Sequence, residues 1–320
     1  MALTLKEAFD STFHEKYCFS DFLVAEAASL SQRFSIAGEH HDERAYYRPT
    51  KTLKTYSRFL NQFVFSHALV AEEVVFSYRK DTSVLQALNN HAGNTCFFKS
   101  DLTNFFESIS VLDIVKLLKN RLAASPISDL CEHQFHIQRL ILIDQRLPIG
   151  LPTSPLISNS ILYDFDMFFA QWAQDHKVTY TRYSDDLIFS AQTDTDLKSL
   201  PSLLDGWLSA HYEGRFRLNP QKTYFTHSGQ KVKLLGLVLL PNGHVTVSRQ
   251  LKNQIETVFH YYLQNKAHFP QLVGQFFGDA TRLMGVLHYV QTVDKGYVTK
   301  LRKKYGNYLV DLFFQHGTKL

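Results

Sequence analysis

The spacing of apolar residues divides the chain into a helical beginning, a mixed middle and a helical end. Residues 1–38 carry apolar side chains at helical intervals, and a second helix is expected from Lys51 to about Leu69. After Ser248 the helical spacing returns in two stretches, Leu251, Ile255, Val258, Phe259, Tyr262 and Leu263, then Leu283, Val286, Leu287, Val290 and Val293. Because such stripes usually face a core, both ends are predicted to be packed helices.

The middle of the chain is typical of short strands. Val178–Tyr183 and Leu187–Ala191 indicate a hairpin whose tip carries Asp185 and Asp186. A further strand is expected to end at Asp101, before a helix that begins near Val111. Leu234–Val247 predicts another hairpin that turns at Pro241-Asn242-Gly243. A helix is expected through Leu156, Ile157, Ile161, Leu162, Phe165 and Phe168, capped by Thr153 or Ser154. The fold class is therefore α+β.

The acidic pair at the hairpin tip is the main chemical signal. Two adjacent carboxylates repel each other, so a fold holds them at a buried tip only where cations neutralise them. The alternative is a solvated Asp-Asp turn, but Asp101 could face the tip from the neighbouring strand. Hard divalent ions such as Mg²⁺ prefer such oxygen ligands. We expect Asp101 and Asp185 to bridge two ions about 3.5–4 Å apart, with Asp186 as a weaker ligand or as electrostatic support.

These segments resemble motifs A and C of reverse transcriptases, with Tyr183-Ser184-Asp185-Asp186 in place of the Tyr-X-Asp-Asp box. Three further segments resemble motifs B, D and E in the family order, Leu147–Pro155, Leu218–Thr223 and Leu234–Val238. The chain looks most like the small bacterial retron-type enzymes. The resemblance implies a right-hand polymerase fold with fingers, an antiparallel-sheet palm and a helical thumb. It places N-terminal helices and fingers in residues 1–95, the palm in 96–247 with a fingers portion near 115–155, and the thumb in 248–320.

The resemblance also implies an activity, that of an RNA-directed DNA polymerase, which is a nucleotidyltransferase. A 3′ or 2′ hydroxyl would attack the α-phosphate of a dNTP, with two Mg²⁺ ions, or Mn²⁺ in their place, as cofactors. Lys222 would protonate the leaving pyrophosphate or steady its charge, unless it is only an exposed loop lysine. The backbone carbonyl of Leu102 would be a further metal ligand. Tyr183, Leu235 and Gly236 would contact the primer or template.

Other candidate residues concern the incoming nucleotide. By resemblance Arg44, and either Arg79 or Lys80, would bind its phosphates, because an arginine fork can grip two oxygens at once. The alternative is that these cations pair on the surface with Asp42, Glu43 or Glu72. Phe106 would lie under the sugar and exclude a 2′-hydroxyl, while Phe105 packs in the core. Gly150 would allow close backbone approach in a loop near the nucleotide.

Composition adds a nucleic-acid partner to this picture. The net charge is only +4, but from Arg249 onward ten Lys and Arg face four acids, which suits a phosphate backbone as well as a solvated helix face. Arg302, Lys303 and Lys304 are the candidates for contact with the template–primer duplex. The three cysteines form no C-x-x-C pair, which argues against structural zinc and fits a reducing cytoplasm. No apolar run is long enough to span a membrane.

Resemblance to retrons implies particular partners. A structured non-coding RNA would serve as template and primer and would be copied into hybrid RNA–DNA (msDNA) that guards an anti-phage effector protein. Two retron boxes are altered: only His91 remains of Asn-Ala-X-X-His, and Leu234-Leu235-Gly236 replaces Val-Thr-Gly. Ile149 replaces a glutamine of many relatives, which bears on fidelity. The alternatives are a non-retron defence-associated reverse transcriptase and a catalytically silent RNA-binding scaffold.

Overall fold

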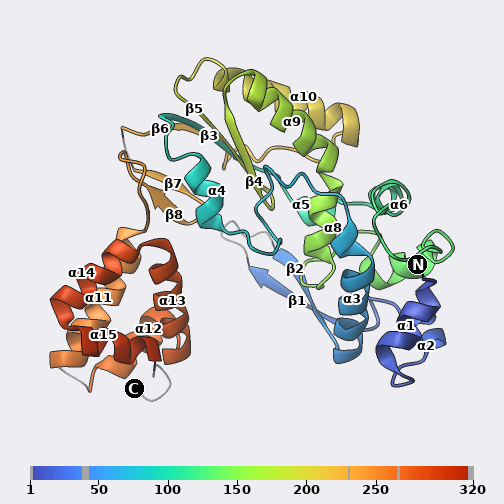
Figure 1. The fold of residues 1–320 in the computed structure, drawn as a ribbon, viewed down its shortest axis with the longest axis horizontal. Coiled ribbons are helices and arrows are strands. Elements are labelled where there is room, and N and C mark those ends of the chain that lie inside the picture. Colours follow the sequence, from blue (N-terminus) through green and yellow to red (C-terminus); the bar gives the residue numbers. More distant parts are fainter. Residues whose placement is uncertain (1–2, 38–42, 230, 265–266, 316–320) are drawn as a thin grey trace. The chain divides into compact units, whose positions relative to one another are not determined.

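The computed structural model describes residues 3–37, 43–229, 231–264 and 267–315. They form two compact units. The first combines Met1–Ala87 with Phe97–Phe225, and the second combines Leu88–Cys96 with Thr226–Leu320 (Figure 1).

The first unit is mixed, as the α+β prediction requires. Its helices are α1 (Leu5–Phe13), α2 (Phe19–Val24), α3 (Lys51–Phe63), α5 (Phe105–Ser108), α6 (Val111–Asn120), α7 (Gln134–Ile141), α8 (Ser154–Ile161), α9 (Tyr163–Asp175) and α10 (Leu200–Tyr212), with 3-10 turns η1 (Phe65–His67) and η2 (Leu197–Ser199). Its strands are β1 (Ser31–Ala37), β2 (Glu43–Pro49), β3 (Cys96–Asp101), β4 (Thr179–Tyr183), β5 (Asp186–Ala191) and β6 (Tyr224–His227). The division between the units falls within β3, after Cys96, and within β6, after Phe225.

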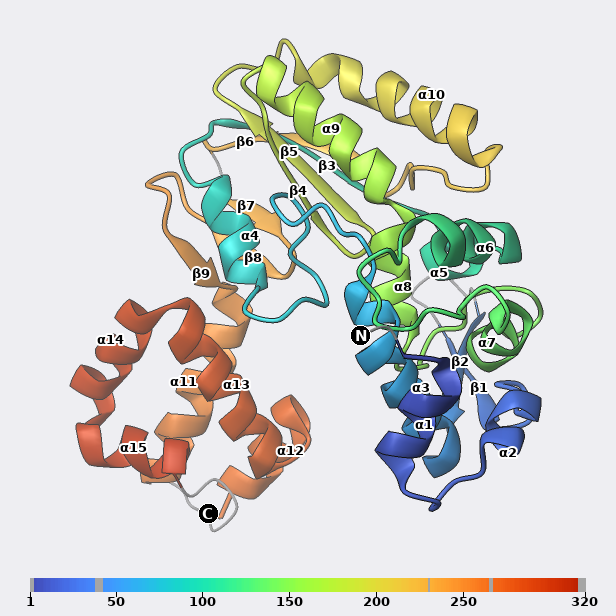
Figure 2. The ribbon, with the colours of Figure 1, turned by 45° about the vertical axis from the view of Figure 1, so that its right-hand side comes forward.

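A four-stranded sheet in the order β4-β5-β3-β6 forms the centre of this unit. Its β4–β5 hairpin is antiparallel, as predicted, and pairs Tyr183 with Asp186, so the second strand begins one residue earlier than the expected Leu187. On one face lie α9 and α10 (Figure 2). The ring of Phe169 in α9 contacts Tyr180 and Phe189 of the hairpin, and Trp207 of α10 contacts Phe169 in turn. This aromatic layer supports the hairpin from behind.

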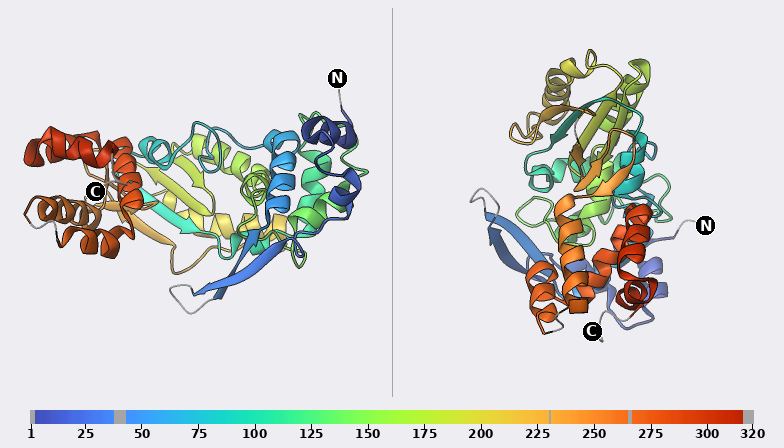
Figure 3. Two further views of the ribbon diagram at one scale, coloured as in Figure 1. Left: turned by 90° about the horizontal axis from the view of Figure 1, so that it is seen from below. Right: turned by 90° about the vertical axis from the view of Figure 1, so that its left-hand side faces the viewer.

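The helical prediction for residues 1–38 is wrong for Ser31–Ala37. This segment is strand β1, which pairs with β2 in a two-stranded antiparallel ribbon, drawn in blue in Figure 3. Phe34 stacks on its cross-strand partner Tyr46, and the guanidinium of Arg48 lies 5.4 Å from the Phe34 ring centroid. Cross-strand pairs of this kind stabilise a ribbon through contacts with a distant segment, which helical spacing does not reveal.

The region after residue 147 also departs from expectation. The predicted single helix is two helices, α8 and α9, separated at Leu162. Neither proposed cap donates or accepts a capping bond: Thr153 occupies the N-cap position without one, and the Ser154 hydroxyl donates to the carbonyl of Pro148 instead. The hydroxyl therefore ties the helix to its own preceding loop.

The second unit is a small sheet followed by helices. Its elements are β7 (Val232–Leu234), β8 (Leu237–Leu239), β9 (Val245–Val247), α11 (Arg249–Gln264), α12 (Phe269–Phe277), α13 (Ala280–Val293), α14 (Lys295–Tyr305) and α15 (Asn307–Gln315), while α4 (Val84–Asn90) crosses from the first unit. The predicted turn at Pro241–Gly243 joins β8 to β9. The expected hairpin is a three-stranded meander, because Leu235 and Gly236 make an additional tight turn with φ of +50° and +79°.

Buried Asp294 joins the sheet and helices of this unit. Its carboxylate accepts hydrogen bonds from the Thr246 hydroxyl of β9 and from the Tyr297 amide at the start of α14. It also forms an ion pair with Lys252 of α11 at 3.0 Å. None of the helices within the described residues combines the length and apolar character that crossing a bilayer requires.

Candidate active site

The structure brings three carboxylates together at one end of the central sheet. Asp101 ends β3, Asp185 lies in the β4–β5 turn and Asp186 begins β5. One oxygen from each lies within 4.8 Å of the others. Oxygen donors this close suit a hard divalent cation, and few other arrangements tolerate three acids at such separations. The residues therefore fit a metal centre.

Backbone contacts fix the two strands that carry these acids. The amide of Leu102 donates to the carbonyl of Asp185 at 3.1 Å, which joins the end of β3 directly to the turn. On the other side, the carbonyl of Asp101 accepts the amide of Asn219 at 2.7 Å. The side chain of Leu102 is buried at this junction. That its backbone carbonyl binds a metal ion remains a prediction.

Burial and mutual repulsion disfavour the ionised forms of these carboxylates. Burial, and then the negative charge of Asp101, raise the pKa of Asp185 from 3.8 to about 6. Burial likewise raises the pKa of Asp186, although a lysine opposes that shift. Both carboxylates would be more easily ionised beside a cation, so the site favours binding one.

That lysine is Lys99, which the sequence analysis missed. Its ammonium lies 2.7 Å from a carboxylate oxygen of Asp186, and both side chains are mostly buried. The ion pair raises the pKa of Lys99 even though burial acts against it. Lys99 lies two residues before Asp101 in the same strand, and alternate residues of a strand share a face. That spacing is the signal that could have identified it.

Lys222 also contacts the cluster. Its ammonium lies 3.1 Å from Asp101, while half of the side chain is exposed. Lys222 is therefore paired with the acidic cluster and is more than an exposed loop lysine.

The family model described as reverse transcriptase (RNA-dependent DNA polymerase) matches residues 40–239, more than half of the chain. The chain belongs to the reverse transcriptase family. It is an RNA-directed DNA polymerase, as expected from its motifs.

Curated relatives extend the match over most of this reverse transcriptase. It is 29% identical to the retron Ec73 reverse transcriptase of Escherichia coli, covering 86% of each chain. It is 22% identical to the retron Ec83 enzyme of the same organism, covering 93% of this chain and 94% of the relative. The resemblance to retron enzymes is therefore confirmed.

Solved structures agree on the fold. A Candida albicans telomerase, described in complex with a fragment of telomeric RNA, matches 97% of this reverse transcriptase with a TM-score of 0.50 and 12% identity, and this chain spans 63% of that one. A Candida tropicalis telomerase matches 88% of it with the same TM-score and 13% identity, and 55% of that chain is covered. At such low identity the likeness supports the right-hand polymerase fold alone.

The phosphate-binding candidates of the enzyme differ in their surroundings. Arg44 lies exposed on β2, and Lys80 is exposed in the loop before α4. Arg79 instead pairs with Glu72 at 2.8 Å and donates to the carbonyls of Glu72 and Val75. For Arg79 the structure thus favours the surface-pairing alternative.

The two phenylalanines of α5 divide as expected in burial. Phe105 is buried against Phe216, and Phe106 is half-buried. Gly150, with φ of +109°, has a different constraint: an added Cβ would lie 2.3 Å from the carbonyl oxygen of Tyr47. Glycine is required here because the loop pairs with β2, independently of any nucleotide.

The primer and template candidates lie in both units. Tyr183 is half-buried at the end of β4 in the first unit. In the second unit, Arg302 pairs with Asp311 and Lys304 with Glu256, while Lys303 is exposed. Leu235 and Gly236 form the turn already described.

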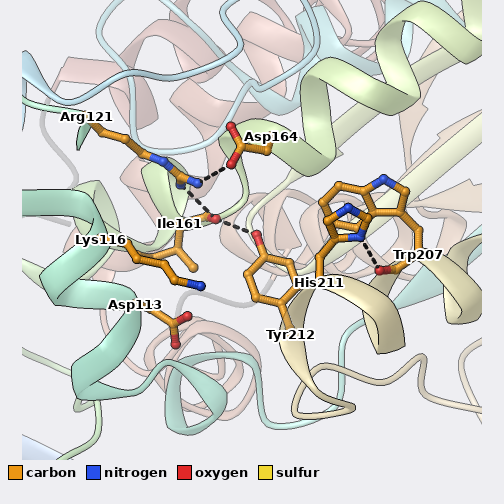
Figure 4. A pocket seen from close by; sticks show the side chains of 8 residues that line it. All are labelled: Asp113, Lys116, Arg121, Ile161, Asp164, Trp207, His211 and Tyr212. Carbon is orange, nitrogen blue, oxygen red and sulfur yellow. Dashed lines mark hydrogen bonds and ion pairs between the residues drawn. The ribbon is translucent and has the colours of Figure 1, made fainter. Parts of the chain in front are cut away.

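A separate cavity of about 140 Å³, lined by both charged and aromatic side chains, lies among α6, α8, α9 and α10 (Figure 4). Arg121 on its wall pairs with Asp164, and the Tyr212 hydroxyl donates to the carbonyl of Ile161. None of the three clustered acids lines it. Since its polar groups bond largely to one another, we assign it no part in polymerisation.

Proposed function

We propose that this enzyme adds dNTPs to a primer on an RNA template with two Mg²⁺ ions, for which Mn²⁺ can substitute, held by Asp101 and Asp185. The observation that carries the proposal is the approach of three carboxylates to within 4.8 Å. When bound, such ions would make the primer hydroxyl more nucleophilic and stabilise charge on the leaving pyrophosphate. The chain itself would mainly orient the reactants, as in other phosphoryl transfers.

The two lysines would have different roles. Lys99 is mostly buried and bound to Asp186, so it would balance that charge permanently. This favours electrostatic support, rather than metal ligation, for Asp186. The half-exposed side chain of Lys222 could swing from Asp101 to the pyrophosphate and donate a proton or steady its charge.

Nucleotide selection would depend on residues of the first unit. Half-buried Phe106 would exclude a 2′-hydroxyl, and exposed Arg44 and Lys80 would meet phosphates. We do not extend this role to Arg79, whose guanidinium is already bonded. Loop 147–154, with Gly150, would lie near the nucleotide.

We further propose that the RNA partner is a structured non-coding RNA that is both template and primer. The product would be hybrid RNA–DNA (msDNA), made in the cytoplasm and coupled to an effector protein in anti-phage defence. Similarity to three retron enzymes of Escherichia coli, over 78–94% of their length, supports the retron type. Exposed Lys303 suits contact with the duplex backbone.

One experiment tests the chemistry. The wild type and an Asp185→Ala, Asp186→Ala variant are given a primed RNA template, dNTPs and Mg²⁺. We expect DNA synthesis by the wild type alone. Equal background in both would favour a catalytically silent scaffold.

A second experiment tests the biological setting. The nucleic acid that copurifies with the enzyme is sequenced. A branched, covalently joined RNA–DNA species is expected for a retron. Long repetitive or untemplated DNA would instead favour another defence-associated reverse transcriptase.

A further inference from the structure

Ser184, which immediately precedes the acidic pair, has an unusual backbone. Its φ is +61°, in the left-handed region that residues other than glycine seldom adopt. A residue persists in such a conformation only where its surroundings hold it there, and these residues concentrate at functional sites. The contacts around Ser184 therefore bear on how the turn is kept in place.

Three groups hold Ser184, each at a different atom. Its amide donates to the hydroxyl of Ser77 at 2.8 Å. Its carbonyl accepts a hydrogen bond from Nη1 of Arg182 at 2.9 Å. Its own hydroxyl lies 3.0 Å from the hydroxyl of Tyr78. Every polar atom of Ser184 is thus bonded to a residue outside the turn.

Arg182 is itself fixed by a buried network. Its side chain is fully buried and makes five hydrogen bonds. Two go to the carboxylate of Asp166 in α9, at 2.8 and 2.6 Å, and two go to Asn159 in α8. The fifth goes to Ser184. A planar guanidinium with five donors suits this geometry, whereas an ammonium could not satisfy all of these acceptors.

Ser77 belongs to the same network. Its hydroxyl donates to the side-chain oxygen of Asn159 at 3.0 Å, and its carbonyl accepts from the amide nitrogen of that side chain. The segment before it runs beside the outer edge of β4, where the backbone of Arg182 donates to Val74 and accepts from Phe76. The loop that contains Ser77, helix α8 and strand β4 are therefore all linked to Ser184 by hydrogen bonds.

We propose that Ser77, Tyr78 and Arg182 form a clamp on Ser184 that holds the Asp185 carboxylate in place to share a divalent cation with Asp101. The proposal rests on the proposed function of these two acids. Arg182 is in this view a positioning residue and does not touch substrate. Because the clamp acts on the turn, its loss should weaken metal binding, and it should leave the KM for dNTP unchanged once metal is saturating.

The test measures Mn²⁺ affinity by electron paramagnetic resonance of the free ion, with full-length enzyme bound to a template–primer and a non-hydrolysable dNTP. Ser77→Ala removes one contact to the turn, and Arg182→Lys keeps the charge opposite Asp166 but loses the fork. Tyr180→Phe is the matched control, because its hydroxyl donates to the same Asp166 at 2.8 Å without contacting the turn.

We expect Ser77→Ala and Arg182→Lys each to weaken Mn²⁺ binding by about tenfold or more, as is usual for groups that orient metal ligands. Tyr180→Phe should bind as the wild type does. If Arg182→Lys fails to fold, Ser77→Ala decides. Wild-type affinity in Ser77→Ala, or an equal loss in Tyr180→Phe, would overturn the clamp. A wild type that neither binds Mn²⁺ nor incorporates dNTPs would instead refute the proposed function.

Discussion

Two aspartates, one in each unit, show how neighbours decide the use of a buried carboxylate. Asp294 has donors on several sides. Although burial alone would raise its pKa, hydrogen bonds from Thr246, Lys252 and the Tyr297 amide lower it from 3.8 to about 2. Asp185 has another carboxylate beside it, and burial together with Asp101 raises its pKa from 3.8 to about 6. Satisfied charge stabilises a fold, whereas unsatisfied charge of the same kind marks a place for a cation.

The largest expected effect comes from neutralising the unsatisfied site. Asp101→Asn or Asp185→Asn should lower the rate of dNTP incorporation by about a thousandfold or more, because the ions that stabilise the transition state lose a ligand. The thermal midpoint should not fall, since repulsion between the acids is relieved. Primer extension and scanning calorimetry check both parts. Loss of activity through unfolding would contradict the comparison.

At Asp294, whose charge is already compensated, substitution should lower stability instead of activity. Asp294→Ala leaves Lys252 without its partner and removes the N-cap of α14, so it should destabilise the second unit by about 3 kcal/mol. Hydrogen exchange of α14 measures this. Asp294→Asn, which can still accept the capping bond, should cost less. Equal exchange in all three proteins would show that the contact is not stabilising.

The pH dependence should differ in sign between the two aspartates. The folded-state pKa of Asp294 is depressed to about 2, so its contribution of about 2 kcal/mol is present above pH 4 and lost as pH falls toward 2. The folded-state pKa of Asp185 is raised to about 6, so metal-free protein should gain up to about 3 kcal/mol as pH falls from 6 to 4.

Denaturant unfolding across this pH range, for the wild type and for Asp185→Asn and Asp294→Asn, isolates each contribution. Saturating Mn²⁺ favours ionised Asp185, so it should remove the gain at low pH and leave the contribution of Asp294. Two contributions of the same sign without metal would refute the contrast.

The smallest expected effect concerns Lys99, which compensates the charge of Asp186 within the acidic cluster. Lys99→Met leaves Asp186 unpaired and should lower kcat by about tenfold, with the metal still bound. Lys116→Met, which removes an exposed lysine of α6, is the control for net charge. Steady-state kinetics separates them. Identical kcat values would mean that the Lys99 pair does not tune the site.

Local patterns were enough to predict the core of this site. The acidic pair between two short strand-like stretches, and Asp101 at the end of a third, identified β3, β4 and β5 with their three carboxylates, because a short run of strand-forming residues is a local signal. Lys99 lies in the same strand as Asp101, but its role depends on Asp186, which is remote in the sequence.

Features that depend on distant partners were missed. β1 is a strand because Phe34 pairs with Tyr46, and Gly150 is glycine because Tyr47 approaches it. For Arg79 the sequence left phosphate binding and pairing with Glu72 both open, and the ion pair at 2.8 Å favours the second. In each case the deciding neighbour is remote in sequence or offers a choice among partners, so spacing alone could not settle the outcome.

The central claim is most directly tested by locating the cations. Crystals of the enzyme with template–primer, a non-hydrolysable dNTP and Mn²⁺ would be measured at a wavelength where manganese scatters anomalously. Two anomalous peaks are predicted, both in contact with the carboxylates of Asp101 and Asp185. Peaks that avoid these two residues, in a complex whose nucleotide is bound, would contradict the account.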